Sequence, residues 1–428
     1  MISLVSIPLM PQSLLNIFKT GKVYLIPDSS YAKNSDWGDI FSGYNDKLEY
    51  AQTGSEKEIA VSESGEIFMS HKNHYEIWLF DRNGNLKSRF GRKGTRPDQF
   101  PMMPSIKTIV GNKYYVTADV GGRLKIFHLN GEYYKSINID FLPRDMGVVD
   151  DNTLMLSGWV IWKNSNRHIV TKIDIATGET DIVYSQFTER SALKVSTIIV
   201  GSDTTLVTEM EPREGKIYLP SEMFFSQPMI SISPFGTFVV ANPGTGSIEY
   251  YNSSGKLLKS ISPDIKPIQI TQKDIDERYN DLITSHETAV KMIENRPDWN
   301  ASKKKSYLEF LSENFEKKKR DYKNLSNFYP TLPYFSTLIF DNEGNLLVFE
   351  YTRTEEEVNN RFSVFALDID GGKVAQASLI SEDYRLSITN RKIIFKDGYL
   401  YAVCEKKGEE GVPLRLMRFI LSPTPGNK

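Results

Sequence analysis

Two histidines, His71 and His74, lie three residues apart in a polar stretch and are the chain's best candidates for metal chemistry. Neutral imidazole is a common metal ligand. The chain has only five histidines, however, and no carboxylate lies at a spacing that would complete a site with this pair. We therefore expect no metal and no cofactor.

Other polar and aromatic side chains occur between the apolar runs. The rings of Trp159 and Trp162 suit stacking on a sugar or an aromatic ligand, and either ring would equally well fill a gap in the core. The full set of candidate ligand-binding residues is His71, His74, Arg92, Arg123, Trp159, Trp162, Asn242, Arg353 and Glu405. No catalytic residue is assigned, because no G-x-S-x-G elbow, Walker loop or Cys-His pairing for the lone Cys404 is evident.

Composition excludes several classes of partner. The 52 Lys and Arg residues against 54 Asp and Glu residues give a net charge of -2, so no overall field favours nucleic acid or an anionic membrane. No stretch reaches the roughly 20 apolar residues of a membrane span. The apolar start, residues 1–10, lacks a basic region and a clear cleavage site, so it is interpreted as a terminal strand or the remnant of a leader.

An internal repeat indicates the architecture that must position these side chains. Three segments share one order of strands and glycine turns, namely Gly65–Gly91, Gly111–Ile137 and Gly236–Ile261, and looser copies cover Asn152–Ser185, Gly344–Leu379 and Gly398–Leu421. An apolar strand precedes each copy, so a unit has four strands in about 40 to 50 residues, as in a propeller blade. The repeat predicts an all-β, six-bladed β-propeller, with seven blades as the alternative.

One repeat also carries a recognisable motif. Residues 77–101 run as an apolar strand, Asp81-x-x-Gly84, a short strand, a glycine-rich bend and Phe100-Pro101. Glycine supplies the positive φ that the tight turn requires. The stretch resembles the NHL repeat, and residues 50–421 resemble the bacterial six-bladed β-propeller proteins related to NHL domains. The resemblance implies ligand or partner binding and a periplasmic or cell-envelope location.

The remainder of the chain departs from the repeat. We predict that residues 1–54 contribute a ring-closing strand, either 22–27 ("KVYLIP") or 47–52 ("KLEYAQ"), to a propeller formed by residues 55–428. Residues 187–227 are interpreted as an inserted hairpin, with a degenerate blade as the alternative. Within 264–330, apolar residues at helical spacing predict an inserted α-helical hairpin that begins with a capping box at Thr271 and Asp274.

Propeller topology suggests where a ligand would bind. Both insertions are connections between blades, so they should rise on the same face as the loops that carry the candidate residues. We expect non-catalytic binding of a small molecule, a carbohydrate or a protein partner at this face, with no role in nucleic-acid binding. The alternatives are a metal-dependent propeller hydrolase or lyase, and a structural platform that uses the helical hairpin for docking.

Overall fold

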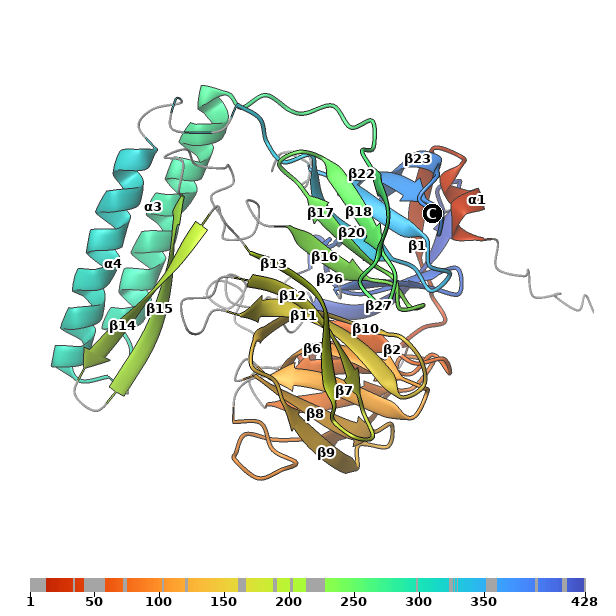
Figure 1. Ribbon diagram of the computed structural model, residues 1–428, viewed down its shortest axis with the longest axis horizontal. Helices are drawn as coiled ribbons and strands as arrows, with labels where there is room; N and C mark the ends of the chain where they lie inside the picture. The colour runs from red at the N-terminus through yellow and green to blue at the C-terminus, as the bar shows by residue number, and fades with distance from the viewer. Residues whose placement is uncertain are drawn as a thin grey trace, which may run out of the picture.

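The computed structural model shows a mostly β chain with a helical pair and a β-hairpin beside the sheets (Figure 1). It describes residues 13–33, 35–41, 58–71, 75–101, 104–119, 122–160, 167–187, 191–200, 203–212, 228–297, 299–322, 326, 328, 330–351, 360–388, 392–409 and 414–426.

Four sheets each contain four consecutive antiparallel strands. Blade 1 comprises β2 (Ile59–Val61), β3 (Ile67–His71), β4 (Glu76–Phe80) and β5 (Leu86–Phe90); blade 2 comprises β6 (Pro104–Val110), β7 (Tyr114–Asp119), β8 (Arg123–His128) and β9 (Tyr133–Asn138). Blade 3 comprises β10 (Leu142–Val148), β11 (Thr153–Val160), β12 (Arg167–Asp174) and β13 (Thr180–Phe187); blade 4 comprises β16 (Met229–Ile232), β17 (Phe238–Asn242), β18 (Ser247–Tyr251) and β19 (Leu257–Ile261). Four-stranded sheets of this kind are the blades of a β-propeller-type fold.

A nine-stranded sheet contains the remaining core strands. They are β1 (Lys22–Pro27), β20 (Phe335–Phe340), β21 (Leu346–Glu350), β22 (Arg361–Leu367), β23 (Lys373–Ile380), β24 (Tyr384–Arg385), β25 (Ile393–Lys396), β26 (Tyr399–Lys406) and β27 (Leu414–Ser422). The N-terminal β1 pairs antiparallel with β27 and parallel with β23. This strand is the first of the two closing strands that the sequence suggested, and the second, 47–52, lies outside the described residues. Two short helices, α1 (Leu14–Phe18) and α2 (Trp37–Ile40), flank β1.

Apolar side chains fill the spaces between successive sheets. One cluster joins blades 1 and 2, a second joins blades 2 and 3, and a third joins blades 3 and 4. A fourth joins blade 4 to β20–β22, and a fifth joins β26 and β27 back to blade 1. The sheets therefore pack in a closed circle, and their central strands, such as β7 and β8, are buried along nearly their whole length because neighbouring sheets cover both faces.

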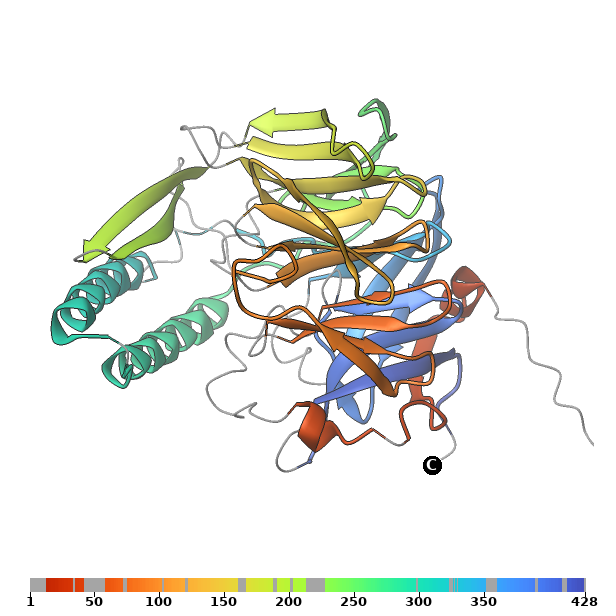
Figure 2. The ribbon, with the colours of Figure 1, turned by 90° about the horizontal axis from the view of Figure 1, so that it is seen from below.

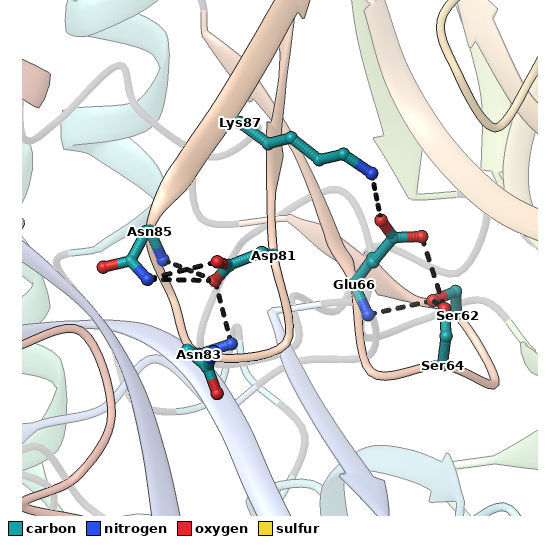
Figure 3. A network of polar contacts seen from close by, with 7 residues as sticks. All are labelled: Ser62, Ser64, Glu66, Asp81, Asn83, Asn85 and Lys87. Carbon is teal, nitrogen blue, oxygen red and sulfur yellow. Dashed lines mark hydrogen bonds and ion pairs between the residues drawn. The ribbon is translucent and has the colours of Figure 1, made fainter.

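On one face of the ring, Asp and Asn side chains accept hydrogen bonds from backbone N–H groups and so stabilise the tight turns between strands. In the β4–β5 turn, Asp81 Oδ1 accepts hydrogen bonds from the backbone N–H groups of Asn83 and Asn85, both at 2.9 Å (Figure 3). Asp341 and Asn252 accept the same pair of bonds in the turns before β21 and β19. Such turns satisfy the backbone locally, so this face, which we call the turn face, has short connections.

The opposite face, which we call the insertion face, carries the connections between sheets. A hairpin of β14 (Ser191–Val200) and β15 (Asp203–Pro212) follows blade 3, and two helices, α3 (Gln272–Glu294) and α4 (Ala301–Asp321), follow blade 4. A capping box at Thr271 and Asp274 begins α3. Figures 1 and 2 show the hairpin beside the two helices, with both apart from the blades. We call α3 and α4 the helical arm.

Candidate binding site between blades 1 and 2

Polar side chains gather between blades 1 and 2. Along β7, alternation places Tyr115, Thr117 and Asp119 on one side of the sheet. Lys107 of β6 and Lys125 of β8 both lie opposite Thr117 in the strand register. The two lysines and Thr117 therefore form a row across three strands that faces blade 1.

Lys107 joins this row to blade 1. Its Nζ donates a hydrogen bond to the carbonyl oxygen of Glu58 at 3.0 Å and lies 3.7 Å from the carboxylate Oε2 of the same residue. The side chain of Lys107 is fully buried and that of Glu58 is 11% exposed. A buried ion pair of this kind is costly to break, because removal of either charge leaves the other buried without its counterion.

Lys125 fixes the loop that leads from blade 1 to blade 2. Its fully buried side chain donates a hydrogen bond from Nζ to the carbonyl oxygen of Pro97 at 2.6 Å. Burial lowers the pKa of Lys125, the neighbouring Arg123 lowers it further, and Asp119 and Asp98 oppose the change. The lysine thereby holds the 91–101 loop over the junction.

Three buried polar atoms of the junction make no hydrogen bond with the described residues. They are Oε2 of Glu58, Oγ of Ser70 and Oη of Tyr115. Burial raises the pKa of Tyr115, the hydroxyls of Thr117 and Ser70 oppose this, and Glu58 adds to it, so these side chains are neighbours. Buried polar atoms usually have a partner, and ordered water or a polar ligand group supplies it where the protein does not.

Two of the candidates from the sequence lie at the surface of this junction. Arg92 is exposed in the 91–101 loop, and its carbonyl oxygen accepts a hydrogen bond from the N–H of Phe100 at 2.8 Å. Arg123 is half-buried at the start of β8, where its N–H donates to Asp119 Oδ1 at 3.2 Å. The charge of Arg123 acts on Lys125, and Arg92 belongs to the loop whose Pro97 carbonyl Lys125 contacts.

Trp159 lies in a different setting, inside blade 3. Its ring is 7% exposed, and the guanidinium of Arg144 lies 3.9 Å from the ring centroid. Its Nε1–H donates a hydrogen bond to Nδ1 of the buried His168 at 2.9 Å. Both the face and the polar edge of the indole are thus occupied by protein groups, as expected for a ring that fills space between strands.

Asn242 and Glu405 hold local structure and lie away from the junction. Asn242 Oδ1 accepts a hydrogen bond from the N–H of Gly244 at 2.9 Å and so shapes the β17–β18 turn. Glu405 Oε2 lies 3.6 Å from Nη1 of Arg385 in the paired strand β24. Neither contact points to a ligand.

The other candidates lie wholly or partly outside the described residues. His74, Trp162 and Arg353 are outside them, and His71 is described only as the last residue of β3, where it pairs with Glu76. Within the described residues, no group of three or more His, Cys, Asp or Glu side chains is placed to hold a metal ion. No helix in the described part of the chain is long and apolar enough to cross a membrane.

The sequence interpretation missed the buried members of the junction. Lys107 and Lys125 each interrupt an otherwise apolar strand, in "SIKTIV" and "RLKIFH", and this interruption is the signal that marks them. A lysine at an inward strand position is rarely buried without a partner. Their partners, Glu58 and Pro97, are far from them in sequence, so the pattern alone does not pair them.

No protein-family model matches the chain, and no curated protein matches it in sequence. Solved structures of β-propeller type resemble it in part. A DUF4221 family member from Bacteroides vulgatus is 13% identical, with 94% of this chain and 99% of that chain covered and a TM-score of 0.44. Virginiamycin B lyase from Staphylococcus aureus is 11% identical, with 85% and 79% covered and a TM-score of 0.37.

A calcium-binding protein, regucalcin, from Agrobacterium tumefaciens is 9% identical to the chain, with 85% of this chain and 88% of that chain covered and a TM-score of 0.39. These neighbours include a lyase and a calcium-binding protein, so they do not agree on one activity. At such low identities, similarity carries no inference about chemistry.

Proposed function

We propose that the chain is a six-bladed β-propeller, related to NHL-repeat proteins, that binds a ligand or a protein partner without catalysis at its insertion face. Strand contacts support the blade count, because β2, β6, β10, β16 and β20 touch in that order and β2 also touches β25. In this arrangement, the nine-stranded sheet supplies two blades, one formed by β20–β23 and one by β25–β27 with β1.

The observation that carries the proposal is the attachment of the helical arm at one end. Ile275 of α3 packs with Tyr322 and Leu332 in an apolar cluster that includes Tyr351 of the ring. Arg278 Nη2 also donates to the hydroxyl of Tyr351 at 3.3 Å. No described side chain of α4 is fully buried, so the arm offers a large surface beside the insertion face.

A groove on the arm supports binding there. It has a volume of about 650 Å³ and follows one face of α4, where its lining includes Ala301, Lys304, Leu308 and Ser312. The lining mixes the apolar Ala301 and Leu308 with lysines, glutamates and a serine, and surfaces that combine apolar and charged side chains commonly contact a partner or a ligand. The exposed Arg92 and the half-buried Arg123 add positive charge on the same face.

The kind of ligand and the cellular location follow from the resemblance to NHL-type propellers. We propose a small molecule, a carbohydrate or a protein as the partner, and the periplasm or cell envelope as the location. The balanced charge of the chain supports the proposal that nucleic acid is not a partner.

The base of the arm allows a direct test by deletion. The N–H of Ile270 donates to the carbonyl oxygen of Pro330 at 3.0 Å, and the N–H of Leu332 donates to Ile268 at 2.9 Å. A short Gly-Ser linker can therefore replace residues 271–329 without stretching the ring. We expect this armless variant to fold, with a far-ultraviolet circular dichroism spectrum that retains the strand signal.

Thermal-shift screening of the full chain, the armless variant and Arg123→Ala against sugars, peptides, calcium and zinc then tests the function. A ligand that raises the melting temperature should do so less in one or both variants, because binding to the folded state stabilises it. Metal analysis is the matched measurement. A stoichiometric metal together with metal-dependent hydrolysis or elimination would overturn the proposal in favour of a metal-dependent propeller enzyme.

A further inference from the structure

Exposed apolar side chains concentrate in one sector of the ring, away from the insertion face. Five of the seven large hydrophobic residues that are exposed in the described chain lie on blades 3 and 4 or on the neighbouring β22–β23 turn. They are Ile182 (60% exposed), Phe235 (54%), Leu257 (48%), Leu258 (54%) and Ile369 (51%). We call this set the apolar rim. Patches of this kind on a folded protein commonly mark an interaction surface.

Close contacts show that the rim is continuous. Gly344 lies between two of its members, because a Cβ at this glycine would be 2.9 Å from Phe235 and 3.2 Å from Ile369. A Cβ on Gly371, in the same turn as Ile369, would meet Lys259 of β19 at 2.9 Å. On the other side, Gly255 in the β18–β19 turn touches Val183, the neighbour of Ile182.

The centre of the rim is an open strand edge. Among the described strands, β19 pairs only with β18, so its outer backbone groups have no strand partner there. Its exposed side chains are Leu257, Leu258 and Ser260. The outer strand of blade 1, by contrast, exposes Lys87 and Arg89, charges of the kind that protect an edge from pairing.

The chain itself shows that an outer strand of this ring accepts a further strand. The outer strand β23 is covered by β1, with Lys22 to Tyr24 beside Ser378 to Ile380 in parallel register. The outer edge of β19 is in the corresponding position of its own sheet, as the fourth strand after β16. A strand from another molecule would complete it in a similar way.

The charges around the rim indicate the source of that strand. Two exposed lysines, Lys256 and Lys373, and three exposed acidic residues, Glu179, Asp181 and Asp370, lie in or beside the strands and turns of the rim. An anionic lipid surface would match an excess of cations, which the rim lacks. A surface that carries both signs suits pairing with a copy of itself, in which lysines of one copy can face carboxylates of the other.

We propose that the chain forms a twofold-symmetric homodimer through the apolar rim, in which β19 of one copy pairs antiparallel with β19 of the other. The interface joins the two rings at their outer edges. Both insertion faces remain free, so dimerisation does not compete with binding at those faces.

Sedimentation velocity over concentrations from about 1 to 100 μM tests the proposal, because this range spans micromolar dissociation constants. The full-length chain should sediment as a dimer at the upper end. Leu258→Lys should weaken dimerisation at least about tenfold, since it places a charge on the paired edge. Tyr134→Lys is the matched control, because Tyr134 is exposed on the outer strand of blade 2, outside the rim, and it should dimerise as the wild type does.

Two results would overturn the dimer. One is a wild-type chain that stays monomeric throughout the range, and the other is a dimer that Leu258→Lys does not weaken. Hydrogen exchange gives a second readout that needs no substitution. The β19 amides of the wild type should exchange more slowly at the dimeric than at the monomeric concentration, whereas those of β9 should exchange equally at both.

Discussion

The guanidinium of Arg418 donates hydrogen bonds from Nε and Nη2 to Oδ2 of Asp28, at 2.8 and 2.6 Å. Arg418 belongs to β27 near the end of the chain, and Asp28 directly follows the N-terminal β1. Nη1 of the same guanidinium donates to the carbonyl oxygen of Arg82 in blade 1 at 3.2 Å. One side chain thus ties both ends of the chain to the first blade.

Asp28→Asn should lower the free energy of unfolding by about 3 kcal/mol, because Arg418, 18% exposed, would lose its anion. Urea unfolding at neutral pH measures the loss. Asp264→Asn is the control, since Asp264 is exposed, and this variant should unfold within about 0.5 kcal/mol of the wild type.

The same pair should make stability depend on pH. Burial alone would raise the pKa of Asp28, but hydrogen bonds from Ser30 and the pairing with Arg418 outweigh burial and hold the pKa below its ordinary value of 3.8. The stabilisation is therefore complete above about pH 5 and is lost as the pH falls through the unfolded-state pKa toward the lower, folded-state pKa. Between about pH 5 and pH 3, the wild type should lose stability more steeply than Asp28→Asn. Equal slopes would contradict this prediction.

Gly84→Ala should be more damaging than Gly21→Ala, although both glycines have φ near +80°. A Cβ on Gly84 would lie 2.7 Å from the Tyr31 ring, whereas a Cβ on Gly21 would meet nothing within 4 Å. Both variants should lose about 1–2 kcal/mol from the left-handed backbone, and Gly84→Ala should lose about 1–3 kcal/mol more from overpacking. Equal losses, measured by urea unfolding, would show that Tyr31 can move aside.

Two aspartates in turns with the same hydrogen-bond pattern should respond in opposite ways to loss of charge. Burial alone would raise the pKa of Asp81, but the hydrogen bonds from Asn85 and Asn83 together outweigh burial and hold the pKa below its ordinary value (Figure 3). Asp341 is 2% exposed, and its burial raises its pKa in spite of the bonds from Asn345. At neutral pH, Asp81→Asn should therefore lose about 1 kcal/mol of charge-assisted hydrogen bonding, while Asp341→Asn should lose less or gain stability.

The pH dependence separates the two aspartates further. The stabilisation that the Asp81 carboxylate provides is lost on acidification, because its pKa is lower in the folded state. Asp341 binds its proton more tightly in the folded state, so it favours folding at low pH and opposes folding as the pH rises through its raised pKa. Unfolding of the two Asn variants at about pH 4 and pH 7 should show opposite changes relative to the wild type.

Lys125→Met should be tolerated better than Lys125→Ala. Methionine keeps the buried volume and removes the cost of burying an ammonium group, at the loss of the hydrogen bond to Pro97, so we expect a change within about 1.5 kcal/mol. Alanine leaves a cavity as well and should lose about 2–5 kcal/mol. If urea unfolding shows equal losses for the two variants, the hydrogen bond to the 91–101 loop outweighs packing.

The repeat and its turns were predictable because they depend on local chemistry. Glycine at Gly84, Gly131 and Gly255 has positive φ in the structure, as the hairpin turns in the sequence require. The apolar spacing of Ile275 and Ile293 similarly marks the face of α3 that is buried. Each signal lies within a few residues of the element that it specifies.

The polar junction could not be predicted in the same way. Lys107 depends on Glu58, and Lys125 depends on Pro97, across 49 and 28 residues respectively. From the sequence, Trp159 looked available for a ligand. Its ring is in fact covered by Arg144 and bonded to His168, and the pairing of β11 with β12 that brings His168 to it is not visible in the sequence. Pairings of this kind follow from the closed ring, which no local pattern encodes.

The pairing of β1 with β27 has a consequence for synthesis on the ribosome. The first strand of the sheet to be made pairs with one of the last, since β1 ends at Pro27 and β27 begins at Leu414. At typical elongation rates of about 5–20 residues per second, the apolar β1 waits roughly 20–80 s for its antiparallel partner. During that interval the nascent chain is an open arc with one uncapped edge, so chaperone capture and premature intermolecular pairing should both be concentrated at residues 22–27.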